Sequence, residues 1–324
     1  MRHRVFLLCL LLAAGAGLCS AQSHHDRSPT DIFKLEPLPG GVYALYGRGG
    51  NVGFYVGPDA VLVVDSQFQE IAPGIIEQIK KVTDKPIKYL VNTHHHADHV
   101  GGNPVFRPFS LIIAHDNVRQ RMLASPEAIQ KEYPALLEKA KKEGKKDAAD
   151  FYAEQIEWAK KVKVEEIAAP ILTFDSEFRL YLGGETIQVW HTPPAHTDGD
   201  SVIYFEKAKV LHTGDLGWNR IIPFIDVKGG GSAAGYATAL DKVLARVPPD
   251  AKVIPGHGKV MDLAGLKEFR KYIADLLVAA QGAKQKGMSR EEFLKSVDLP
   301  AYKDYDGYAD RFKDNCAAAY EEAR

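Results

Sequence analysis

The segment 94–99, which reads His-His-His-Ala-Asp-His, holds the residues of this chain best suited to bind a metal. Neutral imidazoles and carboxylates are ligands for zinc and similar divalent ions. An apolar run at residues 89–92 precedes the segment, and residues 100–103 have the composition of a turn. We therefore expect a loop at the end of a buried strand, where functional residues tend to lie. The alternative is a solvated histidine-rich loop without a metal.

Three later segments have the same arrangement, in which a short apolar run ends at a Gly- or Pro-rich turn that carries a His or an Asp. The runs are residues 188–190, 209–211 and 252–254. In layered α/β proteins, strand ends from separate segments converge on one site. The four strand ends together supply enough ligands for two metal sites, namely His94, His96, Asp98, His99, His196, Asp215 and His257.

These motifs resemble those of the metallo-β-lactamase superfamily. The matching stretches are 94–99, the later His196, the Thr-Gly-Asp of 213–215 and the Pro-Gly-His-Gly of 255–258, and Asp65 matches the family's first motif. The resemblance extends from about residue 41 to about residue 266. It implies an α/β fold of the four-layer αβ/βα type, in which two mixed β-sheets lie face to face with helices outside.

The resemblance also implies two Zn²⁺ ions per chain and a role for each ligand. It assigns His94, His96 and His196 to the first metal, Asp98, His99 and His257 to the second, and Asp215 to both as a bridge. Asp98 and Asp215 would be the catalytic carboxylates, because Asp98 would orient the nucleophile or relay its proton and Asp215 would hold the metals at the correct separation. Coordination lowers the pKa of a water to about 7, so the nucleophile would be a metal-bound hydroxide.

The sequence departs from the two familiar antibiotic-hydrolysing patterns of this family. One pattern has a Cys in the second metal site, and the other lacks the bridging Asp. Here Asp215 is present and no Cys lies near the motifs. The ligand set therefore resembles the broad hydrolase branch of thioesterases, lactonases and phosphodiesterases. Residues 195–200 and 223–226 also look like a secreted bacterial group whose members are often labelled cyclase or β-lactamase-like.

Residues around the ligands are expected to orient the ligand histidines. Asp65 is the first candidate, with Thr93 and Thr197 behind it. His95 would point away from its neighbours in an extended segment and is excluded as a ligand. The other histidines near the motifs are expected to be structural, namely His115, His191 and His212.

The loop after the bridging Asp supplies the candidates for substrate contact, which are Trp218, Asn219 and Arg220. A guanidinium binds carboxylates well, and β-lactams, lactone products and many thioesters offer one. The alternative is an exposed surface charge. The basic signature of glutathione-dependent glyoxalase thioesterases is not found after Asp215.

The N-terminal end has the pattern of a secretory signal peptide over residues 1–21, followed by a polar arm at 22–40. We therefore expect a secreted or periplasmic protein without stable membrane insertion after cleavage, and lipidation at Cys19 stays open. Loss of the signal would leave Cys316 as the sole cysteine, so a disulfide within the mature chain is excluded. The net charge of −1 gives no attraction to nucleic acid.

One domain is expected over residues 41–324, a length sufficient for a large core. Apolar periodicity predicts a hairpin at 42–46 and 52–56, further strands at 61–64 and 111–114, and helices at 71–82, 233–247, 266–280 and 291–296. A helical insertion is expected at about 117–166, with breaks near Ser125-Pro126 and Gly144. Closing helices would occupy about 264–324.

These observations predict a secreted dinuclear zinc hydrolase acting on a small molecule, with a cyclic amide of the β-lactam class as the leading substrate. A lactonase, esterase or thioesterase using the same metals is the first alternative. A diiron redox protein is the second, but redox members typically place a Glu where His96 stands or use a single iron. A metal-holding binding module without turnover is the third.

Overall fold

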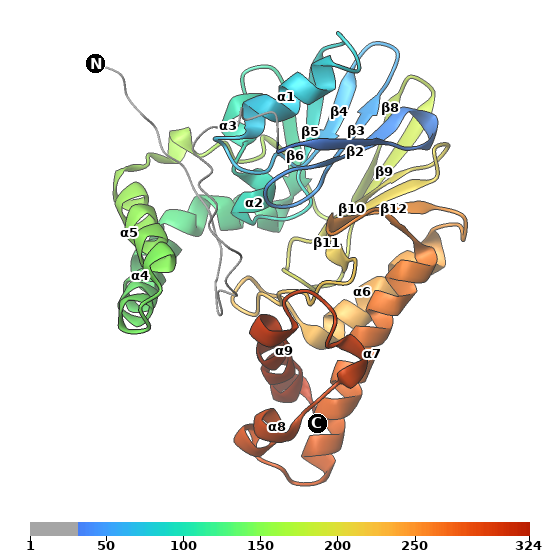
Figure 1. Cartoon of the computed structure of the whole chain (residues 1–324). Coiled ribbons are helices and arrows are strands. Elements are labelled where there is room, and N and C mark those ends of the chain that lie inside the picture. The colour runs from blue at the N-terminus through green and yellow to red at the C-terminus, as the bar shows by residue number, and fades with distance from the viewer. Residues whose placement is uncertain (1–31) are drawn as a thin grey trace.

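The computed structural model describes residues 32–324, so the expected signal peptide, its cleavage site and Cys19 lie outside the described residues. Two β-sheets form the centre of this part of the chain (Figure 1). The first has the strand order β1 to β7, with bounds Lys34–Pro37, Val42–Tyr46, Val52–Val56, Val61–Val64, Ile87–Val91, Leu111–His115 and Leu172–Phe174. The second has the order β13-β12-β11-β10-β9-β8, and β8 to β13 span Glu177–Leu182, Glu185–His191, Ser201–Phe205, Val210–Trp218, Lys252–His257 and Met261–Asp262.

Both sheets are mixed. In the first sheet β1 to β4 pair antiparallel and β4 to β7 pair parallel. In the second sheet β11 and β12 are parallel, whereas the other neighbours are antiparallel. Parallel strands align their carboxyl ends, so the ends of β4, β5 and β6, and those of β11 and β12, gather at one edge of each sheet.

The sheets pack face to face because side chains alternate along each strand. In β4, Leu62 and Val64 lie in the core between the sheets, together with Ile203 and Ile254 of the second sheet. The intervening Val63 faces the opposite side and packs under α1. Helices cover both outer faces (Figure 1). The expected four-layer αβ/βα sandwich is confirmed.

The helices follow in chain order. They are α1 (Ala72–Lys80), α2 (Ala97–Val100), α3 (Asn103–Phe106), α4 (Asp116–Lys142), α5 (Lys146–Lys161), α6 (Ala233–Arg246), α7 (Leu263–Gln285), α8 (Arg290–Ser296) and α9 (Tyr308–Glu322). The predicted helices and the predicted hairpin are all present, with ends that differ by a few residues. The longest difference is in α7, which extends beyond the predicted 266–280 at both ends.

Two local expectations were wrong. Residues 32–40 were expected to be a polar arm, but β1 pairs with β2 because Leu35 packs against the core under α1. The turn expected at 100–103 is present, at Gly101 and Gly102 between α2 and α3. The 212–215 motif was expected in a turn, yet β11 continues through it to Trp218, with shifts in register around Gly214.

The helical insertion forms a hairpin of α4 and α5 that extends away from the sandwich (Figure 1). Its expected break at Ser125-Pro126 is absent from α4. Pro126 cannot donate to the carbonyl of Met122, and the Ser125 hydroxyl donates to that oxygen instead, at 2.8 Å. The expected break near Gly144 is confirmed. The hairpin has a small core of its own, formed by Ile129, Tyr133, Ala140, Ala149, Tyr152 and Ala159.

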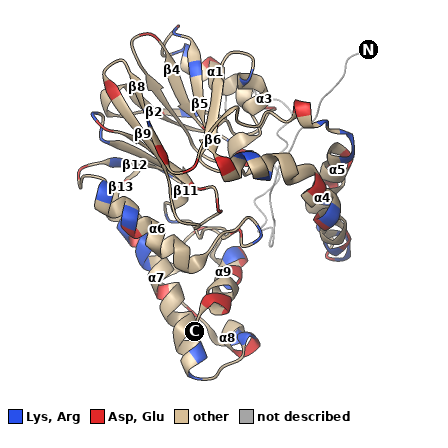
Figure 2. Ribbon diagram, turned by 180° about the vertical axis from the view of Figure 1, so that it is seen from behind, with Lys and Arg blue, Asp and Glu red and all other residues tan. Residues whose placement is uncertain are grey.

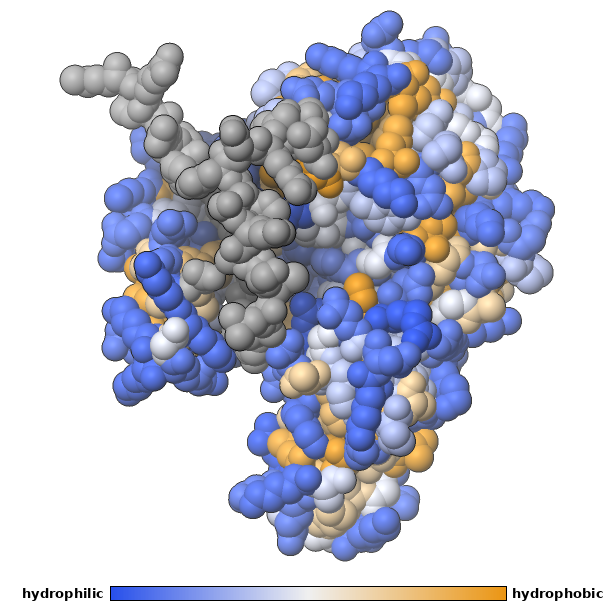
Figure 3. Space-filling model, in the orientation of Figure 1, coloured by the Kyte–Doolittle hydropathy of each residue, from blue (hydrophilic) through white to orange (hydrophobic). Residues whose placement is uncertain are grey.

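The surface of the described residues carries both signs of charge and is mainly polar. Lys, Arg, Asp and Glu are interspersed along α4 and α5 and along the C-terminal helices (Figure 2). Hydrophobic areas on the face in Figure 3 are small and separated by polar residues. No helix among residues 32–324 is long and apolar enough to cross a membrane.

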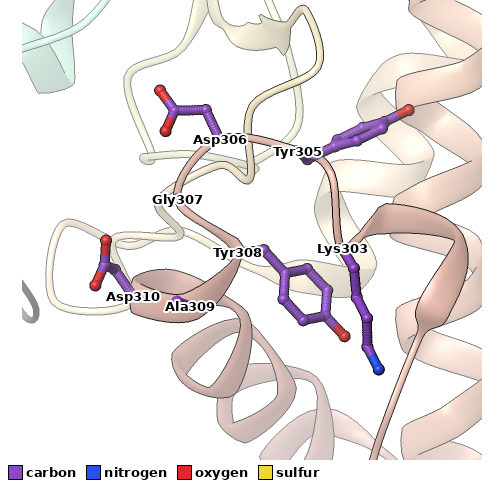
Figure 4. A pocket seen from close by; sticks show the side chains of 7 residues that line it. All are labelled: Lys303, Tyr305, Asp306, Gly307, Tyr308, Ala309 and Asp310. Carbon is purple, nitrogen blue, oxygen red and sulfur yellow. The ribbon is translucent and has the colours of Figure 1, made fainter. Parts of the chain in front are cut away.

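The C-terminal helices close the core on the outer side of the second sheet. Cys316 of α9 is buried in this core, and burial raises the pKa of its thiol to about 12. A shallow hollow near the start of α9 is lined by Lys303 and the stretch 305–310 (Figure 4). Lys303 and Tyr308 both contact Asp298 there. None of the predicted metal ligands lines this hollow.

Asn51, in the loop between β2 and β3, joins the first sheet to the second. Its side-chain amide donates to the carbonyl oxygens of Pro255, at 2.9 Å, and Gly258, at 2.7 Å. Its backbone N–H donates to Gly256 at 2.7 Å, and its own carbonyl accepts from His212 Nε2 at 3.2 Å. One buried residue therefore fixes the loop after β12 against the first sheet.

Asn51→Ala should lower the free energy of unfolding by about 2–5 kcal/mol, because two carbonyl oxygens lose their donor. Urea unfolding in the presence of a chelator would measure this without a contribution from metal loss. Asn219→Ala is the control, since it removes one exposed hydrogen bond to Lys259. Equal losses in the two variants would contradict the role given to Asn51.

Candidate metal centre

The predicted ligands converge from separate strand ends. His94 and His96 follow β5, Asp98 and His99 lie in α2, and His196 follows β9. The remaining two ligands, Asp215 and His257, lie in β11 and at the end of β12. Two groups of ligand atoms result, one of His94, His96, His196 and Asp215 and the other of Asp98, His99 and His257. These are the groups that the family resemblance implied.

The first group is compact enough for a single ion. His196 Nε2 lies 3.2 Å from His94 Nε2, 2.9 Å from His96 Nδ1 and 3.3 Å from Asp215 Oδ2. Donors around a tetrahedral zinc lie roughly 3.4 Å apart, given a Zn–N bond of about 2.1 Å. The residues present therefore fit a zinc ion.

The second group meets the other oxygen of the same carboxylate. Asp215 Oδ1 lies 3.1 Å from His99 Nε2 and 3.4 Å from His257 Nε2. Asp98 Oδ2 lies 3.4 Å from His257 Nε2 and 3.7 Å from His99 Nε2. Asp215 thus presents one oxygen to each group of imidazoles, as a bridging ligand must.

Two ligand atoms of the second group are buried without a hydrogen bond. Among the described residues, His99 Nε2 and Asp215 Oδ1 have no hydrogen-bond partner. Buried polar atoms are nearly always paired, because an unpaired one costs about 1–3 kcal/mol. A cation between these atoms would satisfy both, so the orphaned pair is independent support for a metal here.

The pKa values of the ligand histidines shift in different directions. In the first group, burial lowers the pKa of His94, and burial also lowers that of His196 to about 4, so both rings are neutral and have a free lone pair. Burial would also lower the pKa of His96, but Asp226 outweighs it and raises the value. In the second group, burial alone would lower the pKa of His257, but Asp215 and Asp98 outweigh it and raise the value to about 9. A metal ion would replace the positive charge that these carboxylates attract.

Both carboxylates stay ionised in spite of their burial. Burial opposes the charge on Asp98, but His99 and then His257 lower its pKa to about 2. For Asp215, His257, His99 and His196 likewise overcome burial and hold the pKa well below its ordinary range. Ionised carboxylates and neutral imidazoles are the forms that bind divalent ions.

Two of the three residues predicted to orient the ligands contact them. Asp65 Oδ2 accepts from His99 Nδ1 at 2.7 Å, and Asp65 Oδ1 accepts from the backbone N–H of Thr93 at 2.8 Å. Thr93 Oγ1 donates to Asp65 and lies 3.0 Å from His94 Nδ1. The third, Thr197, instead donates its hydroxyl to Asp200 at 2.5 Å, because the turn after His196 directs it there.

The three candidates for substrate contact are engaged within the chain. Trp218 is buried, stacks on His257 with ring centroids 4.3 Å apart, and donates to the carbonyl of Asp215. Asn219 donates to Lys259. Arg220 pairs with Asp304 and Glu268. All three therefore have partners within the chain, and their contact with substrate stays a prediction.

The other histidines near the motifs lie outside the two ligand groups. His115 and His191 stack with centroids 3.7 Å apart, and His212 donates to Asn51. His95 Nε2 lies 3.9 Å from Asp226, which also contacts His96. Sequence reasoning missed Asp226, because it is 130 residues from His96 and follows no strand-like run. The only signal was the likeness of 223–226 to a secreted group.

Comparison with known proteins agrees with this geometry. A linear primary-alkylsulfatase from Pseudomonas sp. (strain ATCC 19151) is 24% identical over 268 residues, which cover 76% of this chain and 49% of that protein. A metallo-beta-lactamase type 2 from Bacillus sp. (strain 170) is 24% identical over 207 residues, covering 62% of this chain and 63% of that protein. The chain spans about half the length, or slightly less, of the first curated relatives it matches.

Solved structures show the same fold at low sequence identity. A stereoselective inverting sec-alkylsulfatase from Pseudomonas sp. superposes with a TM-score of 0.62 at 19% identity, covering 90% of this chain and 50% of that chain. A metallo-beta-lactamase from Pontibacter korlensis superposes with a TM-score of 0.55 at 17% identity, covering 75% of this chain and 99% of that chain. The family model of the metallo-beta-lactamase superfamily matches residues 45–257, a span that includes every predicted ligand, and the chain belongs to this superfamily of metal-binding hydrolases.

Proposed function

We propose that this chain is a secreted, dinuclear zinc-dependent hydrolase whose substrate is a cyclic amide of the β-lactam class. The observation that carries the dinuclear part is the bridging position of Asp215, whose two oxygens face separate groups of imidazoles. A single-metal site would need only one of these two carboxylate oxygens. The secretory part rests on the signal-like pattern of residues 1–21.

The charge around the ligands supports two divalent ions. Four carboxylates lie in or against the centre, namely Asp65, Asp98, Asp215 and Asp226. Four buried negative charges without cations would be strongly unfavourable. Two Zn²⁺ ions carry four positive charges and would balance them.

When bound, the metals would supply a water of lowered pKa and a Lewis acid for the substrate oxygen. The chain's own residues determine the direction of approach. His257 has 20% of its side chain exposed and Asp98 has 13%, whereas His94 and His99 are fully buried. Substrate would therefore approach over His257 and Asp98. Asp98 would orient the attacking water and accept its proton.

The loop between β2 and β3 lies tightly over the second group. A Cβ added at Gly50 would lie 2.2 Å from His99 Cε1, and one added at Gly49 would lie 2.8 Å from Asp98 Cβ. Gly49 also has a positive φ of 97°. Side chains are therefore excluded from this loop where it covers the ligands, which keeps it close to a bound substrate.

Relatives that are described as β-lactamases support the β-lactam assignment. The chemistry also supports it, because metal-assisted hydrolysis can open a strained amide. Lactones, esters and thioesters have the same reactive carbonyl group as an amide, so they remain the first alternative for the same ligand set. The second candidate is a sulfate ester. It is favoured by the sec-alkylsulfatase superposition, which covers 90% of this chain against 75% for the β-lactamase.

Two zinc ions should bind per chain. Elemental analysis after mild zinc loading and gel filtration would count them. Removal with a chelator should abolish hydrolysis and lower the melting temperature, because a ligand that binds the folded state stabilises it. A stoichiometry of one or none after loading would contradict the dinuclear centre.

The ligand groups should be separable by substitution. Asp98→Asn and His257→Ala should empty mainly the second site, whereas His94→Ala and His196→Ala should empty mainly the first. Asp215→Asn should weaken both, because one carboxylate serves both sites. Zinc content per chain and Co²⁺ absorption would measure this, and an identical loss in all four single-site variants would refute the split.

A matched substrate panel should identify the scissile bond. The zinc-loaded protein should hydrolyse nitrocefin faster than an acyl-homoserine lactone, a thioester or an alkyl sulfate. Asp98→Asn is the control for each substrate and should lower the hydrolysis of every substrate that the metal centre cleaves, because it removes a ligand of the second metal. Turnover of the alkyl sulfate alone would move the assignment to sulfate esters, and turnover of the lactone alone would move it to lactones.

A further inference from the structure

The loop after β11 contacts two of the three histidines of the first group, and the proposed mechanism gives it no task. His196 Nδ1 donates to the carbonyl oxygen of Phe224 at 2.6 Å. Asp226 Oδ2 lies 2.9 Å from His96 Nε2. The backbone N–H of Asp226 also donates to the carbonyl oxygen of His196 at 3.0 Å. Residues 224–226 therefore contact, in both rings, the nitrogen that faces away from the other ligand atoms.

His96 depends on this segment for its tautomer. The ring directs Nδ1 toward the first group, where it lies 2.9 Å from His196 Nε2. A metal ligand needs a lone pair on that nitrogen, so the ring proton must be on Nε2. Asp226 Oδ2 is the acceptor for that proton. His94 and His196 use the opposite arrangement, with the outer proton on Nδ1.

We propose that Asp226 is a positioning residue for the first metal site, one that fixes the tautomer and orientation of His96 and increases its basicity. The inference rests on the proposed metal binding. Carboxylates that accept from a metal-binding imidazole have this effect, and their loss typically weakens metal binding or activity about 10–100-fold.

The Asp226 carboxylate is itself held in place. Its Oδ1 accepts from the backbone N–H of Gly229 at 2.8 Å, and its side chain is only 13% exposed. Arg121 of α4 reinforces the loop by donating to the carbonyl oxygen of Lys228 at 3.0 Å. The distance of 3.9 Å to His95 Nε2 is too long for a hydrogen bond. His96 is therefore the ring that Asp226 serves.

The test isolates each site in turn. Asp226→Ala and Asp226→Asn are made in a His257→Ala background, which leaves the first site, and in a His196→Ala background, which leaves the second. Zinc affinity is measured by competition with a chromophoric chelator, and Co²⁺ absorption reports the coordination of the remaining ion. In the first background, Asp226→Ala should weaken zinc binding about 10–100-fold. Asp226→Asn keeps an acceptor for His96 but loses the charge, so its effect should be smaller.

In the second background both substitutions should leave zinc affinity nearly unchanged. Asp198→Asn is the matched control, because this carboxylate lies on the adjacent loop and pairs with Arg121 rather than with a ligand. Equal weakening by Asp198→Asn, equal weakening of both sites, or unchanged first-site affinity in the folded Asp226→Asn and Asp226→Ala variants would each overturn the inference.

Three results of the same measurements concern the number of zinc ions that the parent protein binds. Binding of two zinc ions by the parent with no effect of Asp226 substitution would refute the positioning role alone. Absence of zinc binding by the parent would refute both this role and the proposed function. A third zinc ion per chain would make Asp226 a ligand, together with His95 and His96, and would also overturn the positioning role.

Discussion

The burial of one shared carboxylate at the junction of the two sheets constrains the rest of the structure. Asp215 is 3% exposed, and each of its oxygens must face a different group of imidazoles. Rotation of the side chain would break both sets of contacts, so its backbone must be fixed. The Asp215 carbonyl accepts from Trp218 Nε1 and from the Tyr236 hydroxyl, which achieves this. The backbone of Gly256 lies so close that an added Cβ would be 2.0 Å from Asp215 Oδ1.

The ligand imidazoles are held by groups of different kinds. His94 is supported by a hydroxyl, His196 by a backbone carbonyl, and His99 by the buried carboxylate of Asp65. Charged acceptors increase the basicity of a ring more than neutral ones. The protein therefore distributes negative charge over both sites instead of concentrating it in the bridge. Asp65 adopts a positive φ of 63° at the end of β4, which lets one carboxylate reach both Thr93 and His99.

Sequence predicted the fold, and the histidines and aspartates that converge at the strand ends, because both leave short local signals. Apolar runs marked the strands, and turn residues marked their ends, where the histidines lie. Contacts between distant segments left no such signal. Asn51, Tyr236 and Asp226 contact ligands or their neighbours across long stretches of chain, and nothing in their local sequence indicates the partner. The ion pairs of Arg220 with Asp304 and Glu268 likewise left no local signal, because their partners lie 48 or more residues away in the chain.

The helical hairpin between β6 and β7 has a consequence for how this chain tolerates change. The apolar core of its outer half is formed by residues of α4 and α5, and Lys228 of the loop after β11 adds an ion pair with Glu132. Its base is different, because Asn117 and Arg121 donate to Asp198, two residues beyond a metal ligand. Substitutions at the tip should therefore disturb mainly this local core, whereas substitutions at Asn117 would loosen the attachment of α4 to the sandwich. Insertions should accordingly be tolerated better at the tip of the hairpin than at its base.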